Sequence, residues 1–142
     1  MDYNQDPDFF KELVSMFKIE AKEHLDTISS GLLQLKKNPH GKERVEISET
    51  VFRAAHSLKG AARTVGLVDI ESISQSLEKL FSIIKQKEVE IPSTLSNTLN
   101  QIINILGELI STMNEQGKLT GDKSSLTRLI DEVNENAVIM GA

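Results

Sequence analysis

The sequence has no cysteine, and only 4% of its residues are aromatic. Without cysteine the chain can form neither a disulfide nor a thiolate metal site, so it suits a reducing compartment, and we expect it in the cytoplasm. It also has no stretch of about 20 consecutive apolar residues, the length that a membrane-spanning helix needs. These absences argue against a disulfide-stabilised secreted protein and predict no membrane insertion.

Positive charge is scarce as well. Lysine and arginine total 16 against 21 aspartate and glutamate residues, which gives a net charge of -5. A protein that holds nucleic acid must neutralise phosphates, so this balance argues against a nucleic-acid partner. The 142 residues are enough for one domain with a single core and leave no room for a second, catalytic domain.

What the sequence does contain is a set of apolar stripes. Apolar residues recur at spacings of three and four, which predicts amphipathic helices over about residues 8–36, 44–65, 69–87, 93–115 and 122–138. Five one-sided helices joined by short loops can bury their stripes only against each other. We therefore predict an all-α fold: an antiparallel four-helix bundle with an additional C-terminal fifth helix. Residues 1–142 form a single domain in this interpretation.

Several residues are suited to begin or end these helices. Asp6 and Pro7 can cap and open the first helix, and the run 38–41, Asn-Pro-His-Gly, should stop it. Gly66 is placed to end the second helix, and Asp69 can cap the third.

One exposed position on the second helix carries a histidine. At about 100° per residue, His56 lies roughly 140° from the centre of the apolar stripe near Leu58, so it should face solvent. Lys59 and Arg63 project from the same side as His56 and predict a small basic island on an acidic protein. A phosphate there would meet positive charge. The alternative is that all three residues are ordinary solvated side chains, which is how we interpret His24.

A glycine accompanies this histidine. Gly60 costs about 1 kcal/mol relative to alanine in a helix interior, so its place beside His56 calls for a further reason. Without a side chain at Gly60, the active site of a partner could approach the imidazole. We therefore expect Gly60, and with it Arg63, to face a partner.

Residues 52–66 read FRAAHSLKGAARTVG. This run closely resembles the phosphorylation-site segment of histidine phosphotransfer (HPt) domains, most of all the N-terminal HPt domain of chemotaxis-type (CheA-like) histidine kinases. The resemblance implies that His56 is phosphorylated on Nε2 and that Lys59 aids the exchange. The two glycines of the motif correspond to Gly60 and Gly66, and Gly66 is interpreted as structural.

The resemblance extends to the third predicted helix. In the chemotaxis-type branch a glutamate there accepts a hydrogen bond from Nδ1 of the histidine, which implies Glu78 in this sequence. Without the resemblance, Glu78 could equally be a solvated residue or a partner of Lys85. That branch often has a second histidine where this chain has Gln75, which can form hydrogen bonds but cannot titrate.

The resemblance also implies a function. His56 would accept a phosphoryl group from the ATP-binding domain of a histidine kinase, in cis or in trans, and donate it to an aspartate of a response-regulator receiver domain. The chain has no Gly-x-x-x-x-Gly-Lys-Ser/Thr loop, so ATP and Mg2+ should be supplied by partner domains. We expect no cofactor, no metal and no enzyme activity in the isolated domain.

Two questions remain open at this stage. The chain could be a free-standing relay protein or the N-terminal part of a larger kinase, and the chemotaxis-type motif favours the kinase. A helical adaptor that binds another protein without phosphotransfer is the alternative function. The sequence names neither the stimulus nor the cognate response regulator.

Overall fold

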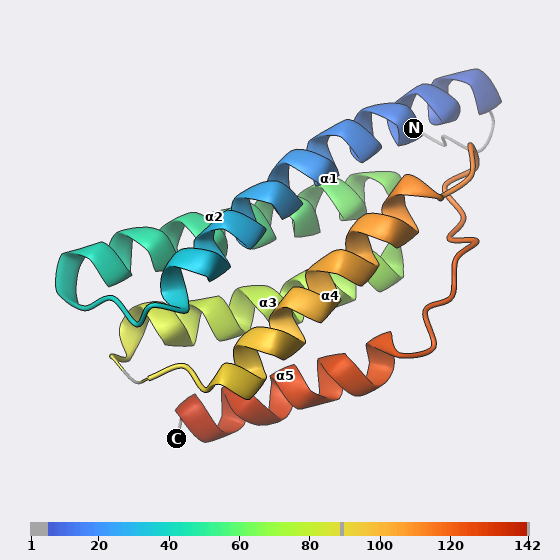
Figure 1. The fold of residues 1–142 in the computed structure, drawn as a ribbon. Helices are drawn as coiled ribbons and strands as arrows, with labels where there is room; N and C mark the ends of the chain where they lie inside the picture. The colour runs from blue at the N-terminus through green and yellow to red at the C-terminus, as the bar shows by residue number, and fades with distance from the viewer. Residues whose placement is uncertain (1–5, 89, 142) are drawn as a thin grey trace.

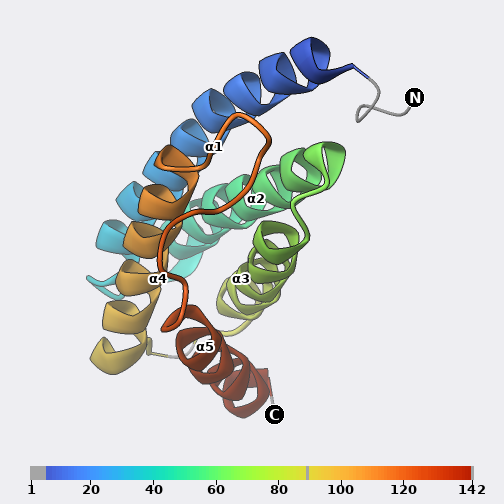
Figure 2. The same cartoon turned by 90° about the vertical axis from the view of Figure 1, so that its right-hand side faces the viewer.

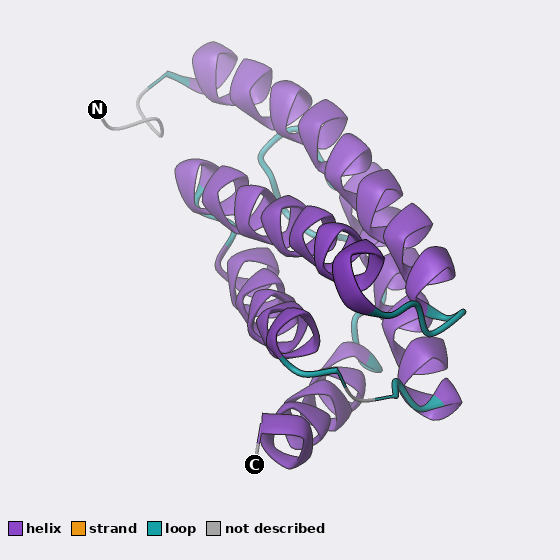
Figure 3. Cartoon of the chain, turned by 90° about the vertical axis from the view of Figure 1, so that its left-hand side faces the viewer, coloured by secondary structure: helices purple, strands orange, loops and turns teal. Residues whose placement is uncertain are grey.

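The computed structural model describes residues 6–88 and 90–141, and these residues form helices and loops without a strand (Figures 1 and 3). The helices are α1 (Pro7–Leu35), α2 (Gly41–Val65), α3 (Val68–Gln86), α4 (Ser93–Ser111) and α5 (Leu126–Gly141). The all-α prediction is confirmed. The finer prediction, an antiparallel four-helix bundle with an added fifth helix, stays a prediction. Residues 1–5, 89 and 142, which we included in the predicted domain, lie outside the described residues.

The five helices pack side by side. Chain direction reverses from α1 to α2 and again from α2 to α3 (Figures 1 and 2). Helix α2 lies between α1 and α3 and packs against both. The fifth helix contacts both α3 and α4, and α4 contacts α1. The strongest packing joins α2 to its two neighbours, so the helix that carries His56 is held on both sides. None of the helices in the described part combines the length and the apolar composition needed to cross a membrane.

The predicted apolar stripes form the core. Nearly all of their residues are buried, among them Val14, Phe17, Ala21, Leu25, Ile28, Leu32 and Leu35 of α1. On the helices that matter for the site, Leu58 of α2 and Leu77 of α3 have no exposed surface. Close packing of this kind fixes the backbones of α2 and α3 relative to each other and thereby fixes the positions of the side chains between them.

Two predicted helix ends are confirmed. The Asp6 side chain accepts a hydrogen bond from the backbone N–H of Phe9 (3.1 Å), and Pro7 occupies the first helical position of α1. At the C-terminal end of α2, the helix that carries His56, Gly66 adopts a φ of 77°. This is the left-handed conformation, which glycine reaches without strain. The N–H of the next residue, Leu67, then donates to the carbonyl of Ala62 (2.9 Å) and closes the turn.

Two predicted helix starts are wrong. The second helix begins at Gly41 rather than near residue 44, because the Glu88 carboxylate accepts a hydrogen bond from the Gly41 N–H (2.6 Å) and satisfies a free donor of the first turn. The third helix begins at Val68, so Asp69 lies in its first turn and is not the cap. Asp69 instead forms an ion pair with Lys123 (2.6 Å).

The loop between α4 and α5 is longer than predicted. The fourth helix ends at Ser111, and the Asn114 side chain then accepts hydrogen bonds from the N–H groups of Gln116 and Lys118, both at 3.0 Å. The fifth helix starts at Leu126 rather than at Asp122, because the Asp122 side chain accepts from the Ser124 N–H (2.9 Å) in a turn that precedes the helix. The fifth helix runs on to Gly141 rather than ending near residue 138.

Candidate functional site

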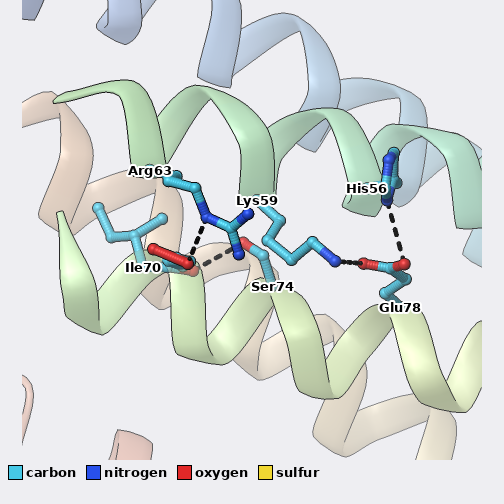
Figure 4. Close-up of polar contacts among 7 residues, drawn as sticks. His56, Lys59, Arg63, Ile70, Ser74 and Glu78 are labelled. Atoms are coloured by element: carbon cyan, nitrogen blue, oxygen red, sulfur yellow. Dashed lines mark hydrogen bonds and ion pairs between the residues drawn. The ribbon is translucent and has the colours of Figure 1, made fainter. Parts of the chain in front are cut away.

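His56 lies on the outer side of α2, and 61% of its side chain is exposed, as its position off the apolar stripe predicts. Its Nδ1 atom lies 3.1 Å from Oε1 of Glu78 on α3, so the predicted contact between these two residues is present (Figure 4). Because Nδ1 takes this contact, Nε2 is the ring nitrogen that points away from the carboxylate. The imidazole therefore contacts Glu78 through Nδ1, and Nε2 faces outward.

Glu78 has a second partner. Its Oε2 atom lies 2.7 Å from Nζ of Lys59, one turn after His56 on α2 (Figure 4). The Lys59 and Glu78 side chains are only 15% and 16% exposed, so this ion pair lies in the groove between the two helices, below the exposed imidazole. One carboxylate thus bridges the lysine and the histidine with its two oxygens.

The electrostatics of Glu78 decide which ring nitrogen of His56 carries the proton. Burial raises the pKa of the Glu78 carboxyl, but the contacts with Lys59 and His56 outweigh it and hold the pKa below its ordinary value. An ionised carboxylate can only accept a hydrogen bond, so Nδ1 of His56 must donate. The neutral ring then has its lone pair on Nε2, the exposed nitrogen. The arrangement makes Nε2 a nucleophile that faces solvent.

The lowered pKa of Glu78 also sets a pH dependence for stability. A carboxyl whose pKa is lower in the folded than in the unfolded state stabilises the fold at pH values above its unfolded pKa. This contribution is lost as the pH falls through the folded-state pKa of Glu78. The network is therefore intact at neutral pH.

The predicted basic island is wrong. Arg63 remains 68% exposed, but its Nε donates to Oε2 of Glu71 on α3 (2.9 Å), and Lys59 is paired with Glu78 in the groove. The third helix packs along this side of α2 and supplies a carboxylate for each cation (Figure 4). A phosphate near His56 would meet a neutralised network rather than two free positive charges.

The other predicted site residues have different surroundings. A Cβ atom on Gly60 would have no heavy atom within 4 Å, so the surface beside His56 is open there. Gln75 is exposed on α3, and its side chain forms no hydrogen bond with another described residue. Gln75 is therefore not joined to the histidine. Gly66 ends α2, as its predicted structural role requires.

Sequence reasoning missed one neighbour of the histidine. The Phe52 ring, one turn before His56, stacks on the imidazole. The spacing of four residues was the available signal. The proposed partnership of Glu78 with Lys85 is wrong, because Lys85 forms its ion pair with Glu49 of α2 (2.7 Å). Within residues 6–88 and 90–141, no group of three or more acidic, histidine or cysteine side chains could hold a metal ion.

We expect Glu78→Gln to change the tautomer balance of His56 without unfolding the protein. The glutamine oxygen can still accept, but a hydrogen bond to a neutral amide is weaker than one to a carboxylate by about 1 kcal/mol, roughly a fivefold change in a population ratio. The Nδ1–H tautomer should therefore lose population, which 15N NMR of the ring nitrogens reports. The matched control is Glu71→Gln, the same change two turns earlier on α3, where the partner is Arg63. An unchanged tautomer ratio in Glu78→Gln would show that the contact is absent in solution.

A family model and the similar curated proteins point to the same family. The family model described as "Hpt domain" matches residues 12–135. Similar curated proteins include the "Chemotaxis protein CheA" of Bacillus subtilis, which is 30% identical over 131 residues, or 92% of this chain and 18% of that protein. The "Chemotaxis protein CheA" of Treponema pallidum is 25% identical over 133 residues, or 93% of this chain and 16% of that protein.

A third relative carries a different name. The "Sensor histidine kinase CheAY" of Helicobacter pylori is 24% identical over 115 residues, or 81% of this chain and 14% of that protein. The chain therefore spans less than a fifth of the length of these curated relatives. No solved structure matches the chain significantly.

Proposed function

Because the chain belongs to the Hpt domain family, we propose that it is a phosphoryl carrier of a two-component system in which His56 accepts and passes on the phosphoryl group. The observation that carries this proposal is the contact of Nδ1 with the half-buried carboxylate of Glu78 (3.1 Å), which leaves Nε2 outward with its lone pair. Members of this family carry phosphate and do not catalyse its transfer from ATP by themselves.

Two steps describe the carrier cycle. In the first, the Nε2 lone pair of His56 forms a bond to the γ-phosphorus of ATP held by a kinase domain. The bond from that phosphorus to the bridging oxygen breaks, and ADP leaves with the electron pair. In the second, a carboxylate oxygen of a receiver aspartate bonds to the phosphorus, and the electron pair of the N–P bond returns to Nε2.

Glu78 and Lys59 support these steps from the groove. The ring becomes more positive as Nε2 bonds to phosphorus, and the Glu78 carboxylate at Nδ1 stabilises that charge. Lys59 contacts the same carboxylate (2.7 Å) and helps to keep it ionised, so its assistance acts through Glu78 at Nδ1. We assign Lys59 this assisting role, Arg63 and Gln75 a partner-facing role, and Gly66 a structural one.

The partners follow from the same proposal. A histidine kinase catalytic domain, in cis or in trans, supplies ATP and Mg2+, and a response-regulator receiver domain takes the phosphoryl group. We propose that the chain is the phosphoacceptor domain of a CheA-like histidine kinase, since chemotaxis proteins of that name are similar to nearly all of it. A cytoplasmic location fits a cysteine-free chain whose donor uses ATP.

For the architecture, we propose that residues 1–142 are one domain whose first four helices form an antiparallel bundle, with α5 as an addition. The reversal of chain direction at the two short connections after α1 and α2 supports this arrangement (Figure 1). The side chains of α5 that pack inward, Leu126, Leu129, Val133 and Ala137, then extend the same core.

A labelling experiment tests the function. The chain is incubated with Mg2+, radiolabelled ATP and the isolated ATP-binding domain of a chemotaxis kinase, and in parallel with a phosphorylated receiver domain. We expect label that is stable in base and released by acid, as a phosphohistidine requires. Folded protein that takes up no label from either donor would contradict the proposal and favour the adaptor function.

We expect two substitutions of Gly60 to have opposite consequences. Gly60→Ala should raise the free energy of unfolding by up to about 1 kcal/mol, because the glycine is helical and open space surrounds the new methyl group. Gly60→Gln should keep the fold but obstruct docking and weaken receiver binding by about tenfold, which corresponds to roughly 1.4 kcal/mol. Denaturant unfolding and titration calorimetry measure the two effects.

The matched control for this pair is Gly107→Gln. Gly107 is a helical glycine of α4 that also has no heavy atom within 4 Å of an added Cβ, and α4 does not carry the site. Its glutamine variant should bind the receiver as the wild type does. If Gly60→Gln also binds and transfers normally, Gly60 does not serve partner access.

A further inference from the structure

The contact with Glu78 alone does not hold the plane of the His56 ring tightly. A hydrogen bond tolerates a range of lengths and angles, so this contact restricts the χ1 and χ2 torsions of His56 but still allows some rotation of the ring within that range. With 61% of the side chain exposed, general packing does not prevent this rotation. The direction of the Nε2 lone pair depends on the ring plane, so a further contact is needed to orient the nucleophile.

Phe52 provides a contact of the required kind. Its ring centroid lies 6.3 Å from that of His56, and the two ring planes differ by 12°. These values describe an offset parallel stack, a favourable geometry for two aromatic rings. Phe52 is itself half-buried and packs against the core, so it is a firm support rather than a second exposed ring.

The Phe52 ring is also contacted from α3. Nζ of Lys85 lies 5.0 Å from the centroid of the Phe52 ring, within the range of a cation–π interaction. Oε2 of Glu49 holds the same Nζ at 2.7 Å, and Oε1 of Glu49 accepts from Nε of Arg53 at 2.7 Å. Hydrogen bonds from Lys85 and Arg53 lower the pKa of the Glu49 carboxyl, so it stays ionised and keeps Lys85 in place at neutral pH.

We propose that Phe52 is a positioning residue for His56, which sets the plane of the imidazole and is anchored in turn by Lys85. Glu78 and Lys85 are seven residues apart on α3 and therefore lie on the same face of that helix. The third helix thus constrains the imidazole in two ways. Glu78 contacts Nδ1 directly, and Lys85 contacts the ring of Phe52, which stacks on the imidazole. This inference rests on the proposed role of His56 as phosphoacceptor.

The test replaces the ring and keeps the apolar volume. In Phe52→Leu we expect His56 to lose the ring-current shift of its Hδ2 and Hε1 protons and to average its rotamers in NMR spectra. Its tautomer ratio should change less than in Glu78→Gln, because the Glu78 carboxylate is intact. Phosphoryl transfer should slow about threefold to tenfold, as expected from the loss of one aromatic contact in the reactive geometry. Phe52→Tyr restores a ring and should restore both the ring order and the rate.

Two further variants separate positioning from general stability. Phe10→Leu removes a phenylalanine that also packs against the core but lies near the start of α1, and it should leave the transfer rate and the His56 spectrum unchanged. Lys85→Met removes the cation and keeps an apolar stem over the ring. It should make the His56 ring less ordered, but by less than Phe52→Leu does. If Phe52→Leu fails to fold, the His56 spectrum of Lys85→Met is the test of the proposal.

The spectroscopic arm uses unphosphorylated protein, so it stands apart from the proposed function. If the wild type takes up no label, the phosphocarrier function fails, while the NMR spectra still decide whether Phe52 orders the ring. A His56 ring that stays ordered in Phe52→Leu, or in Lys85→Met if that variant has to be used, overturns the inference. So does a disordered ring that transfers phosphate at the rate of the wild type.

Discussion

We expect His56→Gln to abolish phosphate uptake completely and to leave the fold intact. The reaction requires a ring nitrogen with an available lone pair, and a glutamine amide has none of comparable nucleophilicity. His56 lies outside the core on the exposed side of α2, so its replacement should change the free energy of unfolding by no more than about 1 kcal/mol. Acid-labile radiolabel and denaturant unfolding measure the two quantities on the same samples.

The chain offers matched controls for this substitution. His24 on α1 is paired with Glu20 of the same helix (3.3 Å), and His40 precedes the first residue of α2. Nδ1 of His40 also faces a carboxylate, Oε1 of Glu88 at 3.7 Å, but among the described residues neither His24 nor His40 has an aromatic ring stacked on it. His24→Gln and His40→Gln should both be labelled at the rate of the wild type. Label that persists in His56→Gln would mean that another residue is the acceptor.

The helices and the exposure of His56 could be predicted from periodicity along one chain segment, whereas the roles of the site residues came from the resemblance to HPt domains. The position of His56 relative to the stripe of α2 predicted its exposure, and the contact of Glu78 with Nδ1, which the resemblance implied, is present. The charge state of the site could not be predicted in this way. Whether Lys59 is free depends on which helix packs beside it, and α3 supplies the carboxylate that neutralises it.

The missed features share a physical cause. Glu88 caps the start of α2 at Gly41 from 47 positions along the chain, and Glu49 reaches Lys85 across 36 positions. Such contacts form only once the helices are packed, and they leave no mark in local propensity or in the spacing of apolar residues. A prediction of helix ends from neighbouring residues alone therefore fails where a distant side chain satisfies the free backbone groups.

Gly31 is another residue whose importance only the packed structure reveals. In the sequence it is a glycine inside a predicted helix, where it costs about 1 kcal/mol relative to alanine and has no evident purpose. In the structure it lies where α1 contacts α2, and an added Cβ atom would collide with Cγ1 of Val51. Val51 has no exposed surface, so its β-branched side chain has little room to turn away.

We therefore expect Gly31→Ala to lower the free energy of unfolding, because forcing an extra methyl group into a packed core usually costs about 1–3 kcal/mol. The propensity gain of alanine, up to about 1 kcal/mol, opposes this cost, so the net loss should reach about 2 kcal/mol. Gly107→Ala isolates the propensity gain, because a Cβ atom there meets nothing within 4 Å, and this control should be more stable than the wild type. Urea unfolding followed by circular dichroism measures both variants.

A double substitution identifies the collision as the cause. Val51→Ala alone should destabilise by about 0.5–3 kcal/mol through the loss of buried methyl groups. In Gly31→Ala combined with Val51→Ala, the new methyl group occupies space that the valine has vacated, so the double variant should be more stable than the sum of the single effects predicts. Additive effects, or a Gly31→Ala protein as stable as Gly107→Ala, would contradict the close approach of α1 and α2 at this glycine, on which the position of the His56 helix depends.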